Sequence, residues 1–374
     1  MIILERVQVL GEDGLSRPRD VEITARGGPE VIDASGCILS PGWIDLHAHL
    51  REPGFSQKET LRSGMRSAAA GGFTHVVAMA NTKPVTDNAS LVRTQIDRTA
   101  GRGIRVSFAG ALTYGLNGAE LTDALALKQA GVVALSDDGQ PVVSTKTLEF
   151  GLSRAGVADL PVFVHAAYGS SPDAEVDAVG DSIEAVRNTP GGRLHVQHVS
   201  TREAVRLIGD AKAQGLNVTA EATPHHLSLT ADEVAYLGPE AAVNPPLRSP
   251  SDRAALMQGL LDGTIDAIAT DHAPHEPGAK AQGAVGFHGF ETALSVVLTL
   301  GLPCEVVYRA CVKRPAEILQ AQVTDDWTLF DPRRSWVVDP DAFHSLGHNS
   351  PFAGSELPGV VRMTIARGEV VYRN

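Results

Sequence analysis

The spacing of apolar residues divides the chain into three parts. Over residues 1 to 40, apolar and polar positions alternate, as at Ile3, Val7 and Val9, and Gly and Pro interrupt the alternation. This period of two residues predicts short antiparallel strands. From about residue 43 to 320, short apolar runs are each followed by a stretch of helical periodicity, and after Trp327 the alternation returns. The middle part therefore consists of strand–helix units, and strands flank it at both ends.

The middle part holds eight such units, each about thirty residues long. Eight parallel strands, each followed by a helix, typically close into a (β/α)8 TIM-type barrel. We therefore expect an α/β fold with a barrel over residues 43–321 and one small composite β-domain from residues 1–42 and 322–374. The expected barrel strands are Trp43–Leu46, His75–Ala80, Arg105–Ala109, Val132–Leu135, Val162–Val164, Leu194–Val196, Val218–Ala220 and Ala267–Ala269, and the expected C-terminal strands are Trp327–Phe330, Trp336–Val338 and Val360–Tyr372. Helical patterns between the barrel strands include Thr60–Ala70, Leu121–Gln129, Thr201–Gln214 and Arg253–Leu261.

Composition and charge exclude several classes of function. Apolar residues make up 43% of the 374 residues, and the formal net charge is −12. This acidic balance, without a basic patch or arm, argues against a nucleic-acid or anionic-membrane partner. Cys37, Cys304 and Cys311 lack CxxC spacing and fit a reducing compartment. The N-terminus lacks the basic and apolar segments of a signal peptide and no run reaches transmembrane length, so we expect a soluble cytoplasmic protein.

Two histidines mark the end of the first barrel strand. His47 and His49 close the segment Trp43-Ile-Asp-Leu-His-Ala-His49, and residues two apart on a strand point to the same face. Neutral imidazoles that converge in this way suit a borderline-soft cation such as zinc. Histidines also occur two apart on strands by chance, so this pair alone is weak evidence.

The ends of the other barrel strands carry further metal-binding residue types. Active sites of such barrels collect at the C-terminal ends of the strands. Turn chemistry accounts for single Asp and Asn residues at such positions, but it does not account for histidines after the first, fifth, sixth and eighth strands. The sequence therefore predicts a site for one or two metal ions bridged by a carboxylate. Its candidate residues at the strand ends are His47, His49, Asp138, His165, His198 and Asp271.

The remaining histidines have weaker claims on the site. His195 lies three residues before His198 on the same expected strand, so we expect it to face the opposite side and to pack there or against a helix. His75 begins its strand and is expected to be structural. His225 and His226 lie in a loop at the mouth of the barrel, where a supporting role and a structural role are equally plausible. His344 and His348 are expected to make local contacts in the terminal β-region.

Several segments resemble a known family. The chain is similar to the amidohydrolase superfamily and, within it, to bacterial dihydroorotases of the class I type. The resemblance implies a zinc-dependent cyclic amidase that interconverts N-carbamoyl-L-aspartate and L-dihydroorotate in pyrimidine biosynthesis. The matching segments, mostly between residues 40 and 300, are PGWIDLHAHLREPG, ETLRSGMRSAAAGGFT, MANTKPVTDN, SDDG, HVQHVSTREAVRLI, VTAEATPHHLSLT, NPPLRSPSDRAAL, LLDGTIDAIATDHAPH and GFETAL.

The resemblance also implies roles for the candidate metal ligands. His47, His49 and Asp271 would hold one zinc ion, His165 and His198 would hold a second, and Asp138 would bridge the two. Hydantoinases and allantoinases usually bridge their metals with a carboxylated lysine, whereas here the fourth strand ends in Asp138, which favours a dihydroorotase. The family chemistry uses a metal-bound hydroxide as nucleophile, with Asp271 as general acid and base.

The substrate of this family carries a free carboxylate, which calls for a cation with planar donors. Arg51 is the expected partner of this carboxylate, and an ion pair of Arg51 with Glu52 or Glu59 is the structural alternative. The resemblance implies that substrate also contacts His49, Asn81, Asn244, His275, Val285 and Gly286. The glycine-rich segment 278–289 after His275 is a candidate substrate-covering loop.

Two stretches depart from the family pattern. The segment Ala166–Pro172 after His165 lacks the usual acidic pair and is shorter than in relatives, and the strands before Trp327 are cut down. Two alternatives to an active dihydroorotase stay open: another cyclic amidase of the hydantoinase or dihydropyrimidinase type, and a non-catalytic scaffold that partners aspartate transcarbamoylase. A homodimer and a transcarbamoylase complex are candidate assemblies of an active enzyme.

Overall fold

Eight parallel strands form a barrel in the computed structural model, which describes residues 1–374. Neighbours along the chain are neighbours in the sheet, in the order β6 to β13. The barrel closes where Ala48 forms a parallel bridge with His272. The strands are β6 (Trp43–Ala48), β7 (Phe73–Ala78), β8 (Arg105–Gly110), β9 (Ala134–Ser136), β10 (Val162–Val164), β11 (Leu194–Val196), β12 (Val218–Ala222) and β13 (Ala267–Ile268). The expected (β/α)8 barrel is thus confirmed.

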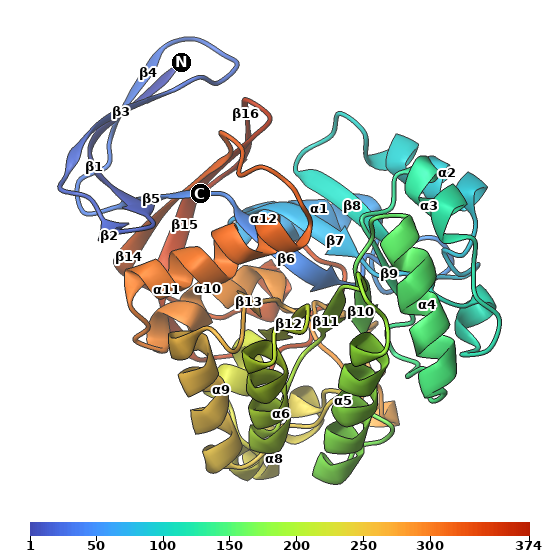
Figure 1. Cartoon of the computed structure of the whole chain (residues 1–374). Helices are drawn as coiled ribbons and strands as arrows, with labels where there is room; N and C mark the ends of the chain where they lie inside the picture. The colour runs from blue at the N-terminus through green and yellow to red at the C-terminus, as the bar shows by residue number, and fades with distance from the viewer.

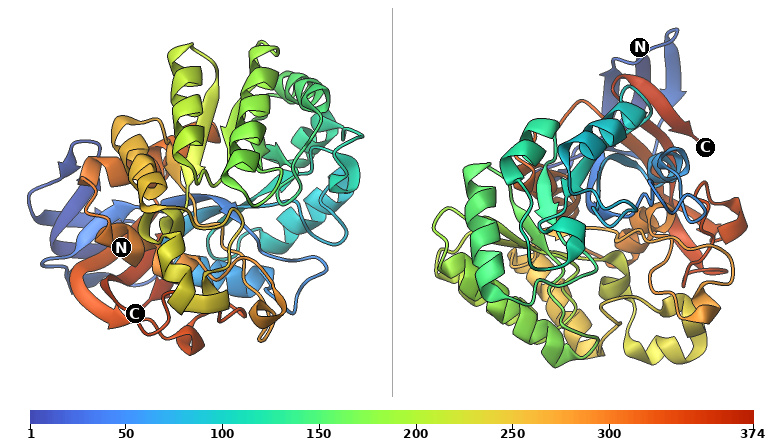
Figure 2. Two further views of the ribbon diagram at one scale, coloured as in Figure 1. Left: turned by 90° about the horizontal axis from the view of Figure 1, so that it is seen from below. Right: turned by 90° about the vertical axis from the view of Figure 1, so that its right-hand side faces the viewer.

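Helices surround the barrel strands on the outside (Figures 1 and 2). Thr60 and Thr201, which the sequence pattern places inside helices, are N-caps whose side chains accept from the backbone N–H of Ser63 and Ala204. The helices are α1 (Leu61–Ala70), α2 (Ala89–Thr99), α3 (Ala124–Ala130), α4 (Thr145–Val157), α5 (Pro172–Arg187), α6 (Arg202–Ala213), α7 (Pro224–Ser228), α8 (Ala231–Leu237), α9 (Pro250–Asp262), α10 (Phe290–Thr299), α11 (Cys304–Tyr308) and α12 (Arg314–Ile318).

A second sheet joins the two ends of the chain, and both termini lie on its side of the molecule (Figures 1 and 2). Its main path runs β16-β15-β14-β5-β1-β2, and β3 and β4 also pair with β1. The strands are β1 (Ile2–Gly11), β2 (Gly14–Leu15), β3 (Arg19–Ile23), β4 (Glu30–Asp33), β5 (Ile38–Pro41), β14 (Trp327–Val337), β15 (Glu356–Ala366) and β16 (Glu369–Arg373). The exact boundaries of a separate β-domain stay a prediction.

Three details of this sheet differ from the sequence expectation. The N-terminal strands are not all antiparallel, because β4 and β5 run parallel to β1. The two expected strands around Trp327 and Trp336 form one strand, β14, whose register with β15 shifts between Asp331 and Ser335. Conversely, the expected strand Val360–Tyr372 is interrupted by Arg367 and Gly368, both at positive φ, and becomes the hairpin of β15 and β16. Local irregularities of this kind break the period of two and hide continuity or a turn.

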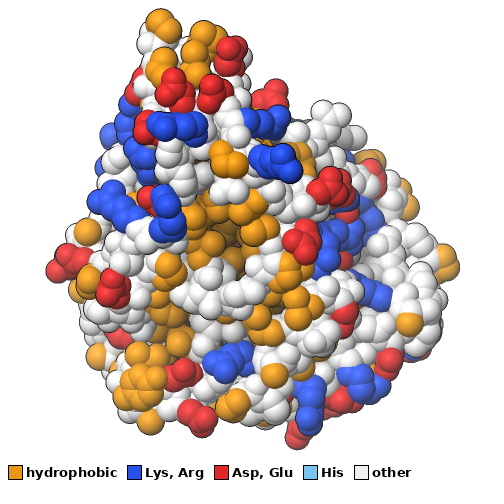
Figure 3. Space-filling model, turned by 90° about the vertical axis from the view of Figure 1, so that its left-hand side faces the viewer, with side chains coloured by type: hydrophobic (Ala, Val, Ile, Leu, Met, Phe, Trp, Pro, Cys, Tyr) orange, Lys and Arg blue, Asp and Glu red, His pale blue; other side chains and the backbone are white.

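The buried apolar residues of the barrel form two separate clusters. The largest cluster lies between the strands and the surrounding helices, with Val76, Phe108 and Val162 among its members. A smaller cluster that includes Leu46 and Phe163 forms a separate group of buried residues. None of the helices combines the length and apolar content that crossing a membrane requires. On the face drawn in Figure 3, acidic and basic side chains are intermixed, and hydrophobic atoms gather near its centre.

Candidate active site

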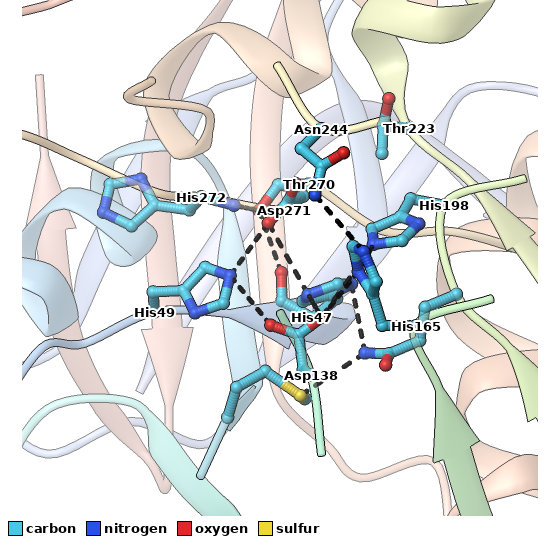
Figure 4. Close-up of polar contacts among 12 residues, drawn as sticks. His47, His49, Asp138, His165, His198, Thr223, Asn244, Thr270, Asp271 and His272 are labelled. Atoms are coloured by element: carbon cyan, nitrogen blue, oxygen red, sulfur yellow. Dashed lines mark hydrogen bonds and ion pairs between the residues drawn. The ribbon is translucent and has the colours of Figure 1, made fainter. Parts of the chain in front are cut away.

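Six side chains from five strand ends point toward one centre at the C-terminal end of the barrel (Figure 4). The turns that follow β9, β10, β11 and β13 supply four of the residues, and β6 and the residue after it supply two. All six side chains are buried. Parallel strands of a barrel end on the same side, which brings these distant residues together. The six residues are His47, His49, Asp138, His165, His198 and Asp271.

His47, His49 and the two aspartates form one half of this cluster. Nε2 of His47 lies 3.3 Å from Oδ1 of Asp138 and 3.5 Å from Oδ1 of Asp271. Nε2 of His49 lies 2.9 Å from Oδ1 of Asp271 and 3.5 Å from Oδ2 of Asp138. Both imidazoles therefore present a nitrogen to the same two carboxylates.

His165 and His198 form the other half, again around Asp138. Nδ1 of His165 lies 3.6 Å and Nε2 of His198 lies 3.8 Å from Oδ1 of Asp138. The two ring nitrogens are 2.8 Å apart. Ligand-type atoms of His47, His49 and Asp138 lie within 4.8 Å of one another, and so do those of Asp138, His165 and His198. Asp138 is common to both groups, as expected for a bridging carboxylate.

This donor set fits a divalent metal. Imidazole and carboxylate are ligand types of zinc and of other transition metals. Nε2 of His47 is buried and has no hydrogen-bond partner, although it faces Asp138 and Asp271. A buried polar atom without a partner costs about 1–3 kcal/mol, which a bound cation would offset. The structure brings the predicted ligands together, and their individual roles stay a prediction.

Charge coupling within the cluster shifts several pKa values. Burial lowers the pKa of His47, but Asp138 and Asp271 outweigh it and hold the pKa well above its usual range. Burial raises the pKa of both aspartates, and the surrounding histidines reverse this and lower it. Burial also lowers the pKa of His198 to about 3. The aspartates are thus ionised at neutral pH, as metal ligands require.

Glu221, which the sequence analysis did not single out, contacts the ring nitrogen of His47 that faces away from the two aspartates. Its carboxylate is fully buried, with Oε1 2.8 Å from Nδ1 of His47 and Oε2 3.0 Å from Nε2 of His195. A carboxylate on one ring nitrogen fixes the tautomer and leaves the other nitrogen free to bind metal. Burial raises the pKa of Glu221, but the hydrogen bonds from His195 and His47 lower it to about 2. The signal in the sequence was an acidic residue directly after the expected strand Val218–Ala220, at a position that belongs to β12 in the structure.

His195 is packed in the interior, as expected, but the expectation that it faces the side opposite to His198 is wrong. The ring centroid of His195 lies 4.6 Å from that of Phe163 at an interplanar angle of 48°, and its Nε2 contacts Glu221, so it lies on the same side as the cluster rather than opposite to it. The strand β11 ends at Val196, and His198 has a positive φ of 35°. The alternation of a strand therefore does not extend from His195 to His198, and their spacing carries no information about their faces.

A cavity of about 160 Å³ opens above the cluster. It is small for a ligand pocket, which favours a small ring compound over a polymer. Arg51 lines this cavity and forms no ion pair with Glu52 or Glu59, and its Nε donates to the carbonyl of Pro274 at 3.3 Å. Every predicted substrate contact lines the cavity: His49, Arg51, Asn81, Asn244, His275, Val285 and Gly286.

Neighbouring groups orient the side chains of this lining. Oδ1 of Asn81 lies 3.0 Å from Nδ1 of His49, and Nδ2 of Asn244 lies 3.2 Å from Nε2 of His165. Nε2 of His275 lies 2.7 Å from the carbonyl oxygen of Val285, so His275 donates there. Burial lowers the pKa of His275 to about 4 and that of Arg51 to about 10. At neutral pH His275 is therefore neutral, and Arg51 carries the positive charge of the cavity.

His75, His226 and His344 lie outside the cluster and contact neighbouring groups of the fold. His226 lies in α7, with Nε2 3.0 Å from the carbonyl oxygen of Pro245, and His225 beside it is also buried. His75 contacts the hydroxyl of Ser107 at 2.8 Å, and His344 contacts Glu291 at 2.9 Å. These positions agree with the structural reading of His75 and His344.

The short segment after His165 leads directly into α5, and a carboxylate of that helix reaches back toward the site. Glu175 is buried and accepts from the backbone N–H of Ser200 at 2.8 Å and of Thr201 at 3.0 Å. Nη2 of Arg248 lies 3.4 Å from the same carboxylate. Glu175 thus anchors the segment that follows His198, although the segment after His165 has no acidic pair.

Similarity to known proteins agrees with this geometry. The family model described as dihydro-orotase-like matches residues 36–181. A dihydroorotase from Pelobacter propionicus is 40% identical, and the match covers 99% of this chain and 96% of that protein. The chain belongs to the dihydroorotase family. A second dihydroorotase, from Anaeromyxobacter sp. (strain K), is 41% identical over 96% of this chain and 90% of its own length.

Solved structures extend the likeness to the fold of other cyclic amidases. An L-hydantoinase (dihydropyrimidinase) from Arthrobacter aurescens superimposes with a TM-score of 0.89 at 24% identity, covering 100% of this chain and 96% of that one. A dihydropyrimidinase from Brevibacillus agri superimposes with a TM-score of 0.85 at 22% identity, covering 100% and 95%. At this level of identity the likeness shows that the dihydroorotase-family chain shares their barrel, and it does not distinguish substrates.

Proposed function

We propose that the chain is an active, metal-dependent dihydroorotase that interconverts N-carbamoyl-L-aspartate and L-dihydroorotate. The observation that carries the proposal is the convergence of four histidines and two aspartates around Asp138, beneath a cavity whose cation is Arg51. Relatives about 40% identical over nearly the whole chain bear the name dihydroorotase. A non-catalytic scaffold is disfavoured, because none of the six candidate ligands is replaced.

The metal is proposed to be zinc, with one or two ions per subunit. His47, His49 and Asp271 would hold the first ion, His165 and His198 the second, and Asp138 both. A metal held there polarises the amide carbonyl of the substrate and activates a water for attack. The remaining chemistry belongs to side chains of this chain.

Asp271 is the proposed general acid and base. Its side chain lines the cavity and is ionised, so it can accept a proton from the attacking water. The protonated carboxyl group then delivers this proton to the ring nitrogen as the amide bond of dihydroorotate breaks. In the direction of ring closure, Asp271 removes the proton from the carbamoyl nitrogen and returns it to the departing water. Oδ1 of Asp271 lies 2.9 Å from Nε2 of His49, so both groups face the position that the first metal ion would occupy.

Arg51 is proposed to bind the carboxylate that dihydroorotate retains outside its reacting amide. Its guanidinium offers a planar pair of donors, and Asn81 and His275 lie on the same cavity wall. Asn244 and the backbone of Val285 and Gly286 are proposed to contact the pyrimidine ring. Hydantoinase-type substrates lack this carboxylate, so a half-buried arginine in the cavity favours dihydroorotate over dihydrouracil.

The test is hydrolysis of dihydroorotate by the zinc-supplemented protein, with Asp271→Asn beside it and the metal content of both measured by mass spectrometry. We expect turnover in the wild type and a fall of about 10²–10⁴-fold in kcat for the variant. Loss of turnover with metal retained supports the proton-transfer role, whereas joint loss of metal and turnover assigns Asp271 to ligation alone. Turnover of dihydrouracil without turnover of dihydroorotate would contradict the proposed substrate.

We also propose a cytoplasmic location and two candidate assemblies. Cys37, Cys304 and Cys311 are all unpaired, which fits a reducing cytoplasm. A homodimer and a complex with aspartate transcarbamoylase remain the candidate assemblies. Light scattering of the protein alone, and then with that enzyme added, distinguishes a monomer from either assembly.

A further inference from the structure

A second cavity lies on the outside of the barrel between α1, the end of α2 and β16. Its volume is about 410 Å³, within the range of small-molecule pockets. Four arginines line it, namely Arg62, Arg66, Arg98 and Arg102, together with a single acidic residue, Glu52. None of its lining residues also lines the cavity of the candidate active site.

The charge of this cavity is opposite to that of the chain. The chain has 44 acidic and 32 basic residues, yet here four cations face one carboxylate. Arg98 pairs with Glu52 at 2.9 Å, whereas Arg62, Arg66 and Arg102 form no ion pair. Three arginines without an acidic partner leave net positive charge in the cavity, and an anion bound among them would neutralise it.

The arrangement of the arginines suits a ligand with several anionic oxygens. Arg62 and Arg66 are four residues apart on α1, so they share one face of that helix. Arg98 lies in the last turn of α2, and Arg102 follows four residues later in the turn after the helix. Each guanidinium can donate two parallel hydrogen bonds to one phosphate group.

The floor of the cavity is apolar. Leu61 and Met65 are buried on the inner side of α1, and Val371 of β16 completes the surface. A phosphate ion alone would leave this floor uncovered. A phosphorylated molecule that also carries a flat or apolar group would cover it while its phosphates meet the arginines.

We propose that this cavity binds a nucleotide-sized phosphorylated small molecule, with the phosphates on the four arginines and the remainder on the apolar floor. Within the protein, Glu52 competes with this ligand for Arg98. Its Oε1 accepts from Arg98, and its Oε2 accepts from the backbone N–H of Leu61 at 2.8 Å. A bound phosphate would replace Glu52 as the partner of Arg98. Glu52 directly follows Arg51, which lines the cavity of the candidate active site.

The test measures binding of pyrophosphate and of ADP to the metal-loaded protein by calorimetry at about 0.15 M salt. We expect the double variant Arg62→Ala/Arg66→Ala to bind pyrophosphate and ADP about 100-fold more weakly, because each substitution removes a charge-assisted contact to the ligand. Arg93→Ala is the matched control, because Arg93 is exposed on the same α2 as Arg98 but does not line the cavity. This control is expected to leave Kd within about twofold.

Two further arms complete the experiment. Glu52→Gln is expected to tighten pyrophosphate binding, because it removes the competing charge, and circular dichroism checks that the variant is folded. ADP is expected to bind more tightly than pyrophosphate if the apolar floor is used. Unchanged affinity in the double arginine variant would place the anion at the active-site metal and overturn the proposal, as would an equal loss in the Arg93 control. Equal affinity for ADP and pyrophosphate would overturn the assignment of the floor.

Discussion

The buried carboxylate of Glu221 offers a decisive perturbation of the site without touching a proposed ligand. In Glu221→Gln the amide replaces a carboxylate that faces Nδ1 of His47 at 2.8 Å and Nε2 of His195 at 3.0 Å. The amide oxygen can accept from one ring, so the amide nitrogen is left against the other ring's N–H. His47 then loses either its tautomer or its orientation toward the metal.

The size of the effect follows from the pKa of Glu221. Lowering that pKa from 4.5 to about 2 corresponds to about 3 kcal/mol of preference for the ionised form in the folded state. Because the folded pKa is depressed, this stability is fully present above pH 4.5 and is lost as pH falls from 4.5 to about 2. We therefore expect Glu221→Gln to lower the free energy of unfolding by about 2–4 kcal/mol at neutral pH. Metal affinity should fall by about 10–100-fold.

Two assays separate these effects. Urea unfolding of the metal-free protein gives the stability change, and competition with a chromogenic chelator gives metal affinity. Glu291→Gln is the matched control, because the Glu291 carboxylate also contacts two histidines, His288 and His344, away from the site. Burial raises the pKa of Glu291, but these histidines lower it to about 2, as at Glu221.

The control should therefore lose similar stability but keep wild-type metal affinity. If Glu221→Gln also keeps wild-type metal affinity, Glu221 does not orient His47, and the reasoning from the two ring contacts is wrong. If both variants lose metal affinity, the loss reflects global destabilisation.

Three further outcomes are expected. Arg51→Lys should raise KM for dihydroorotate by about 10–100-fold with little change in kcat, since a point charge replaces the planar fork; steady-state kinetics checks this, and an unchanged KM would refute the carboxylate role. Gly286→Ala should also raise KM, because φ at Gly286 is +99° and an added Cβ would lie 2.6 Å from Cβ of Ala273; calorimetric titration with substrate measures the loss, and wild-type affinity would contradict it. The affinity for zinc should rise with pH above 6.5, because the pKa of His47 is held well above that usual value and the ring must release its proton to bind metal; chelator competition at two pH values above 6.5 tests the sign.

The candidate site was largely predictable because strand ends are visible in the sequence. An apolar run that ends in a histidine or aspartate is a local pattern, and a parallel barrel gathers all such ends on one side. This pattern alone predicts that His47, Asp138, His165 and Asp271 lie in one cluster. The family resemblance then supplied the substrate carboxylate for which Arg51 is the expected partner, and it supplied Asn244, whose place in the cavity no local pattern indicates.

The predictions that were wrong concern positions where the backbone leaves its regular period. His195 was assigned to the wrong face because β11 ends before His198, whose φ is positive. Glu221 was passed over because its partners, His47 and His195, lie 174 and 26 residues away. A carboxylate inside a strand reveals its role only when its contacts are known.

The sequence by itself determined the elements, their order and the chemical identity of the site, because hydrophobic period and residue type are properties of local segments. Only the tertiary structure decided which side chains face one another. It placed Asp138 between two histidine groups, put Glu221 against Nδ1 of His47, and brought four arginines from α1, α2 and the turn after α2 into one cavity. These outcomes depend on how strands close and helices pack, and contacts between distant segments leave no periodic trace along the chain.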